Sequence, residues 1–160
     1  MCDIPEKVSD EEVIVRGVCS PYHVKDGKIK RGLYDPTPDT DEISVMRHNY
    51  MGSDACKVKA KELEDRAHNK IFEGLAVLSA LQIRSTHFDV KDSRDSAYLG
   101  HADIKVGIIV PRGGEPLPPE QLQVLRDRQK MLLRLTNYFP DPDRQATNWT
   151  GEKLIPKRDA

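Results

Sequence analysis

Short runs of apolar residues separated by polar turns recur between residues 13 and 110, which is the pattern of β-strands. Residues 13–18 (VIVRGV) form an apolar run that Arg16 interrupts. Residues 43–49 (ISVMRHN) carry apolar side chains on both faces, which is typical of an inner strand. Further strands are predicted at residues 75–78, 87–90 and 104–110, the last with regular alternation.

A tight hairpin is predicted within residues 22–34 (YHVKDGKIKRGLY), where Asp26-Gly27 separates two short runs. An Asp-Gly pair in this position favours a turn in which both central residues have positive φ. The hairpin is basic, because it carries Lys25, Lys28, Lys30 and Arg31. A charged hairpin is most often a solvated edge that discourages edge-to-edge pairing. The alternative is contact with phosphate or with an acidic partner.

Helical periodicity appears twice. Apolar residues at helical spacing predict a helix over residues 54–70, with Ser53 as its N-cap and Asp54 in its first turn. A turn at Glu73-Gly74 is expected to follow this helix. A second helix is predicted over residues 120–138, after a proline-rich linker.

These elements predict one α+β domain over residues 12–139: a mixed or antiparallel sheet of about five strands packed against two main helices. A chain of 160 residues has the size of one ordinary domain. Residues 1–11 are expected to form a charged lead-in. Residues 140–160 are expected to form a polar tail whose apolar anchors, Trp149 and Leu154-Ile155, dock on the domain or on another chain.

Composition narrows the class of protein. The 25 Lys and Arg residues nearly balance the 26 Asp and Glu residues, so only a local patch can attract an anionic partner. No apolar run approaches the roughly 20 residues that cross a bilayer, and the acidic start is unlike a secretory signal. Three cysteines without a CxxC pair are expected to be free thiols. A cytoplasmic protein without membrane contact is therefore expected.

The common catalytic and cofactor motifs are missing, among them GxxxxGK[ST], GxGxxG, HExxH and GxSxG, so no cofactor is expected. Polar residues near the predicted strand ends remain as candidates. The candidate ligand-binding residues are Arg16, Ser44, Arg47 and Arg84, and the candidate acid/base residues are His48, His87 and His101. Guanidinium groups match phosphate or carboxylate oxygens in pairs, and histidine moves protons near neutral pH. Each of these residues also has an ordinary structural interpretation.

Arg16 has two interpretations, because an arginine within a strand either lies at an edge of the sheet or directs its charge into a cleft.

The pairs His87 with Asp89 and His101 with Asp103 suit a divalent metal in their chemistry, but their spacing matches no metal motif. No metal site is therefore predicted.

Two short stretches, Arg16-Gly17 and Ser44, are similar to the opening of the arginine-serine-glutamate ADP-ribosyltransferases, in which such residues hold NAD. The chain lacks the family's closely spaced Gln/Glu and Glu pair after a later strand. The similarity therefore supplies no catalytic residue.

The leading hypothesis is a small cytosolic binding or accessory protein that acts through a surface for a partner protein. The basic hairpin, the Arg47-His48 strand end and the tail would form that surface. The alternative is an enzyme that processes a nucleotide or phosphodiester and binds its phosphate, or a nucleic-acid phosphate, with the Arg/His cluster. This alternative requires that the arginines and histidines converge in space. The oligomeric state stays open.

Overall fold

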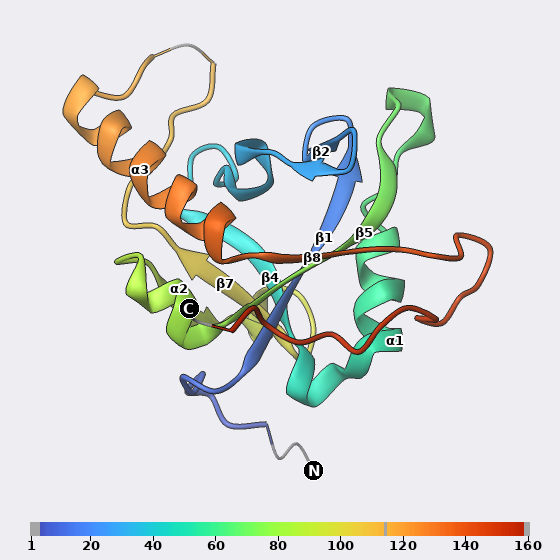
Figure 1. The fold of residues 1–160 in the computed structure, drawn as a ribbon. Helices are drawn as coiled ribbons and strands as arrows, with labels where there is room; N and C mark the ends of the chain where they lie inside the picture. Colours follow the sequence, from blue (N-terminus) through green and yellow to red (C-terminus); the bar gives the residue numbers. More distant parts are fainter. Residues whose placement is uncertain (1–3, 114, 159–160) are drawn as a thin grey trace.

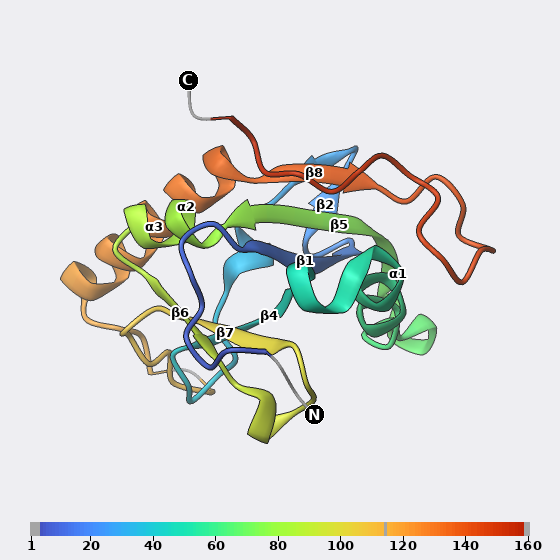
Figure 2. The same ribbon diagram turned by 90° about the horizontal axis from the view of Figure 1, so that it is seen from below.

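The structure, a computed structural model, describes residues 4–113 and 115–158. Cys2, the start of the lead-in, Gly114 in the linker and the end of the tail lie outside the described residues. Within the described ranges, six strands form one antiparallel sheet in the order β6-β7-β4-β1-β5-β8 (Figure 1, and Figure 2 for β6). The strands are β1 (Val13–Ser20), β4 (Glu42–Arg47), β5 (Ile71–Ser79), β6 (Asp89–Asp92), β7 (His101–Lys105) and β8 (Asn137–Pro140). The predicted α+β fold class is thereby confirmed.

The predicted hairpin is present as a separate two-stranded ribbon, β2 (Val24–Lys25) and β3 (Lys28–Ile29). Asp26 and Gly27 have φ values of 53° and 76°, so both central residues adopt the left-handed conformation that an Asp-Gly turn favours. The short 3-10 helix η1 (Arg31–Tyr34) then leads the chain toward β4.

Helices cover both faces of the sheet (Figure 2). The helices α2 (Ala80–Ser85) and α3 (Pro119–Leu135) pack with η1 on one face, and α1 (His48–Lys61) lies on the other. The strands alternate accordingly: on β1, Ile14 and Val18 belong to the first core, while Val15 and Cys19 belong to the second. No helix in the described part of the chain is both long and apolar enough to cross a bilayer.

The contact between β1 and α1 requires a glycine. A Cβ atom added to Gly17 would lie 2.7 Å from the Cβ of Ala60, well inside van der Waals contact. The absence of a side chain on Gly17 and the small side chain of Ala60 therefore allow the helix to pack closely on the strand.

The first predicted helix corresponds to the second part of α1. The helix α1 begins at His48 and is broken at Gly52 (φ 81°, ψ 166°), so the predicted start at residue 54 lies just after this break, but α1 ends at Lys61 rather than at residue 70. The chain after Lys61 turns through the short helix η2 (Arg66–His68). Leu63 has the helical spacing of a buried position but is 45% exposed, because the apolar spacing in the sequence continues beyond the end of the helix.

Several further boundaries differ from the prediction. Gly74 lies inside β5 rather than in a turn, and an added Cβ there would overlap the carbonyl oxygen of Phe139 on β8. The strand predicted at 104–110 is β7, which begins at His101 and already ends at Lys105. The second helix ends at Leu135, and residues expected to extend it form β8 at the sheet edge. The intrinsic strand propensity of a segment does not predict that it pairs at the edge of a sheet, because this pairing depends on the partner strand.

The C-terminal segment after β8 turns back and runs alongside that strand (Figure 1). Trp149 and Leu154 are buried in the second core. The fully buried Lys57 of α1 donates hydrogen bonds to the Asp141 carboxylate (3.1 Å) and to the carbonyl oxygens of Asp143 (2.8 Å) and Asn148 (3.0 Å). Individual side chains anchor this segment at irregular intervals, and its sequence therefore shows no periodicity.

Candidate functional site

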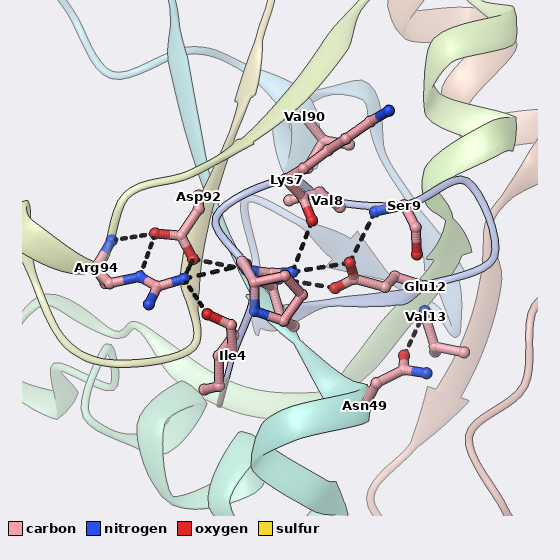
Figure 3. Close-up of polar contacts among 12 residues, drawn as sticks. Ile4, Lys7, Val8, Ser9, Glu12, Val13, Asn49, Val90, Asp92 and Arg94 are labelled. Atoms are coloured by element: carbon pink, nitrogen blue, oxygen red, sulfur yellow. Dashed lines mark hydrogen bonds and ion pairs between the residues drawn. The ribbon is translucent and has the colours of Figure 1, made fainter. Parts of the chain in front are cut away.

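Arg47, the centre of the predicted Arg/His cluster, is fully buried and engaged within the protein. Its Nε and Nη2 atoms donate to Glu12 at 2.7 and 2.8 Å, and its Nη1 donates to Asp92 at 2.7 Å. Nη1 also donates to the carbonyl oxygen of Pro5. Figure 3 shows Glu12 and Asp92 beside the N-terminal segment. Because all three nitrogens donate internally, Arg47 serves to hold residues 5–12 against the sheet.

Arg84, another predicted ligand-binding residue, holds the same segment. It forms ion pairs with Asp10 (2.7 Å) and Asp89 (3.0 Å) and donates to the carbonyl oxygen of Val8. Arg94, which was not predicted, donates to Asp92 and to the carbonyl oxygen of Ile4 (Figure 3). Three arginines of the folded domain thus bind the lead-in.

The Asp92 carboxylate lies between two of these arginines. Burial acts to raise the pKa of Asp92, but hydrogen bonds from Arg94 and Arg47 outweigh it and hold the pKa below its ordinary value. The carboxylate is therefore ionised at neutral pH, as an ion pair requires.

The three candidate histidines have separate surroundings. His48 Nε2 lies 2.8 Å from Ser53 Oγ, and burial, aided by Lys153, lowers the pKa of His48. His101 is buried, and its Nδ1 lies 2.5 Å from Ser93 Oγ.

His87 is exposed and follows α2 with a φ of 69°, a conformation that commonly ends a helix. Within residues 4–113 and 115–158, no side-chain contact joins two of the candidate histidines. Among the described residues, no group of three or more His, Cys, Asp and Glu side chains is placed to hold a metal ion.

Arg16 and Ser44 are the predicted site residues that the structure brings into contact. The Nε of Arg16 donates to the carbonyl oxygen of Leu33 at 2.6 Å, and its Nη1 donates to the carbonyl oxygen of Ser44 at 2.6 Å. No carboxylate of the described residues lies within ion-pair distance of this guanidinium. Burial lowers the pKa of Arg16, and nearby groups such as Asp35 only partly offset it. Arg16 therefore differs from Arg47 and Arg84.

A cavity of about 640 Å³ lies beside Arg16. Its walls come from the chain after β1, from η1 and the loop that follows it, from the linker before α3, and from α3 itself. The residues that line it are Arg16, Tyr22, His23, Gly32, Asp35, Pro36, Thr37, Pro38, Lys70, Val110, Pro111, Glu115, Pro116, Leu117, Leu122, Leu125 and Arg126. Arg16 thus directs a charge into a cleft, the less ordinary of the two interpretations of a strand arginine.

Asp35 and His23 define the polar side of this cavity. Asp35 accepts hydrogen bonds from Tyr22 Oη (2.6 Å), Gln129 Nε2 (2.9 Å) and Arg126 Nη1 (3.3 Å). These donors already compensate the negative charge of its carboxylate. His23 Nδ1 accepts a hydrogen bond from the backbone N–H of Cys19, which leaves the ring proton on Nε2. Burial, with smaller effects of Arg16 and Lys70, lowers the pKa of His23 to about 3, so the ring is neutral.

Sequence reasoning missed several residues of this cavity, notably Lys70 and Arg126. Lys70 lies in the turn before β5. Arg126 lies on α3, where the helical periodicity of the sequence identifies only the apolar positions. No local pattern places these two side chains beside Arg16.

The basic hairpin presents a second unusual arrangement. Lys25, Lys28, Lys30 and Arg31 are all exposed, and none forms an ion pair with a carboxylate of the described chain. Among the residues that the structure describes, Lys30 Nζ donates only to the carbonyl oxygen of Pro21, at 3.3 Å. Tyr22, at the base of the hairpin, is 60% exposed. The hairpin is therefore a local positive patch on a protein whose net charge is −1.

Comparisons of the chain with protein-family models, with curated proteins and with solved structures find no match.

Proposed function

We propose that this protein is a binding protein that presents its basic hairpin to an acidic surface of a partner protein. The observation that supports this is the set of unpaired cations on the hairpin, Lys25, Lys28, Lys30 and Arg31. Cations elsewhere in the molecule are often paired, as Arg47, Lys57 and Arg84 are. Complementary charges across an interface guide association and select partners.

Protection of an exposed sheet edge explains this charge less well. Each strand of the hairpin has two residues, and the ribbon is separate from the six-stranded sheet of the described chain. Such a short ribbon has almost no edge to protect. Tyr22 adds an exposed aromatic surface beside the cations, a residue type that is enriched in protein interfaces.

The enzymatic alternative has less support. It needs an acid/base histidine next to an anion-binding arginine, whereas His48 and His101 contact serines, and Arg47 and Arg84 contact carboxylates. A binding role requires no such convergence.

Charge reversal on the full-length protein tests the proposal. The variant Lys25→Glu/Lys28→Glu/Lys30→Glu changes the hairpin, and Lys91→Glu/Lys130→Glu/Lys153→Glu makes the same net change at exposed positions elsewhere. The probe is a fluorescein-labelled peptide of alternating Glu and Tyr, followed by fluorescence anisotropy at low and physiological salt. At about 0.5 kcal/mol or more per reversed charge, the hairpin variant should bind at least about tenfold more weakly.

The control variant should lose much less affinity, because its charges lie away from the contact. Equal losses of affinity in the two variants would show that the effect depends on net charge alone, and would refute a binding surface specific to the hairpin. Single-stranded DNA of equal charge is the second probe. If the protein binds that DNA more tightly than the peptide, and the hairpin variant loses this binding, the proposed partner would be a nucleic acid rather than a protein.

A further inference from the structure

The Arg16 guanidinium carries a charge that the described chain does not neutralise. Its Nε and Nη1 each donate to a backbone carbonyl oxygen, while Nη2 makes no hydrogen bond with the described residues. Arg16 is partly buried, so water compensates its charge only in part. An anion that enters the adjoining cavity would supply the missing compensation.

The walls of the cavity indicate what the rest of the ligand is like. A volume of about 640 Å³ falls in the range of cavities that enclose small organic molecules. Much of the cavity wall is apolar, and its apolar residues include Pro36, Pro38, Val110, Leu117, Leu122 and Leu125. Such a wall favours an apolar body next to the charged group.

The charges that line the cavity favour a single negative charge on the ligand. Three cations (Arg16, Lys70 and Arg126) face two carboxylates (Asp35 and Glu115), which leaves one positive charge in excess. Asp35 already accepts from Arg126. The neutral His23 ring, whose Nε2 carries the proton, adds a donor without adding charge. A di- or triphosphate would bring several charges into a site that balances one.

We infer that the cavity beside Arg16 binds a small organic monocarboxylate with an apolar body. The planar guanidinium fork matches a carboxylate in geometry. Tyr22 borders both the cavity and the proposed partner surface, but none of the hairpin cations lines the cavity, so changes to those cations distinguish the two sites.

Titration of the full chain with 2-naphthoate, followed by ¹H–¹⁵N correlation spectra, tests the inference. The neutral analogue 2-naphthalenemethanol and the phosphate analogue 2-naphthyl phosphate are the comparison probes. Naphthoate should shift backbone signals around the cavity and should bind at least about tenfold more tightly than the alcohol. Arg16→Gln should reduce naphthoate affinity by about tenfold or more, and Arg16→Lys, which keeps the charge but not the fork, by less.

Leu122→Trp provides a variant that leaves Arg16 and its backbone contacts unchanged. Its larger side chain should fill part of the cavity and weaken naphthoate binding, even if Arg16→Gln fails to fold. The triple hairpin variant should bind naphthoate like the wild type, which separates this inference from the proposed function. Absence of shifts at millimolar naphthoate, or unchanged affinity in Leu122→Trp, would overturn the inference. Tighter binding of the phosphate analogue would overturn the assignment to a carboxylate.

Discussion

Replacement of Arg47 by alanine tests the role of the most deeply buried cation of the predicted cluster. If Arg47 served only to bind a ligand, its removal would leave the fold intact. The structure leads to the opposite expectation for Arg47, whose guanidinium bridges Glu12 and Asp92.

The magnitude follows from the two carboxylates. Glu12 has a side chain that is 3% exposed and would lose its cationic partner, while Asp92 would keep Arg94. Loss of one partner of a buried ion pair costs ~3–5 kcal/mol, because the remaining charge stays buried and uncompensated. Domains of this class have unfolding free energies of ~5–15 kcal/mol, so the loss is a large fraction of the total. At roughly 2–4 °C per kcal/mol, the Tm should fall by about 6–20 °C.

Urea unfolding followed by circular dichroism gives the free energy of unfolding directly. Arg112→Ala is the control, because its contact with Asp39 is 3.5 Å long and both side chains are largely exposed. That change should cost less than ~1 kcal/mol. The double variant Glu12→Gln/Arg47→Met should be less destabilised than Arg47→Ala, because it buries no unpaired charge. A loss below ~1 kcal/mol in Arg47→Ala would show that the ion pair does not hold the lead-in, and would refute this reasoning.

Lys57→Met should release the C-terminal segment and shift the fluorescence emission of Trp149, the single tryptophan of the chain, to longer wavelength. Unchanged emission would contradict the anchoring role of Lys57. Gly17→Ala should lower the unfolding free energy by ~1–3 kcal/mol in urea titrations, since the new methyl group would overlap Ala60, and a neutral result would mean that the helix can shift. The lowered pKa of Asp92 gives stability that is present above the unfolded pKa of about 4 and is lost as the pH falls through the folded pKa. Urea midpoints measured across the acid range should therefore fall less steeply in Asp92→Asn than in the wild type, and parallel curves would exclude this contribution.

Secondary structure could be predicted where the signal is local. The Asp26-Gly27 turn formed as expected, because the turn conformation depends on those two residues themselves. Gly74 was interpreted as a turn because its reason, close approach of the β8 backbone, lies on a distant segment. The early end of α1 was missed for a similar reason, since the apolar spacing continued into residues that do not pack on the sheet.

The candidate residues divide in the same way. Sequence reasoning chose Arg16, Arg47 and Arg84 by residue type and position, and it gave all three the same role. Partners decide between them: Arg47 and Arg84 meet carboxylates, whereas Arg16 meets two carbonyl oxygens and a cavity.

The sequence by itself determined the α+β class, the basic hairpin and the near-zero net charge, because each depends on local periodicity or on composition. Tertiary structure alone decided which charges are neutralised. Arg47 meets an aspartate 45 residues away, and Arg16 meets a carbonyl group 28 residues away. Electrostatic compensation depends on distance in space and on withdrawal from water, and neither quantity is encoded in the spacing of residues along the chain.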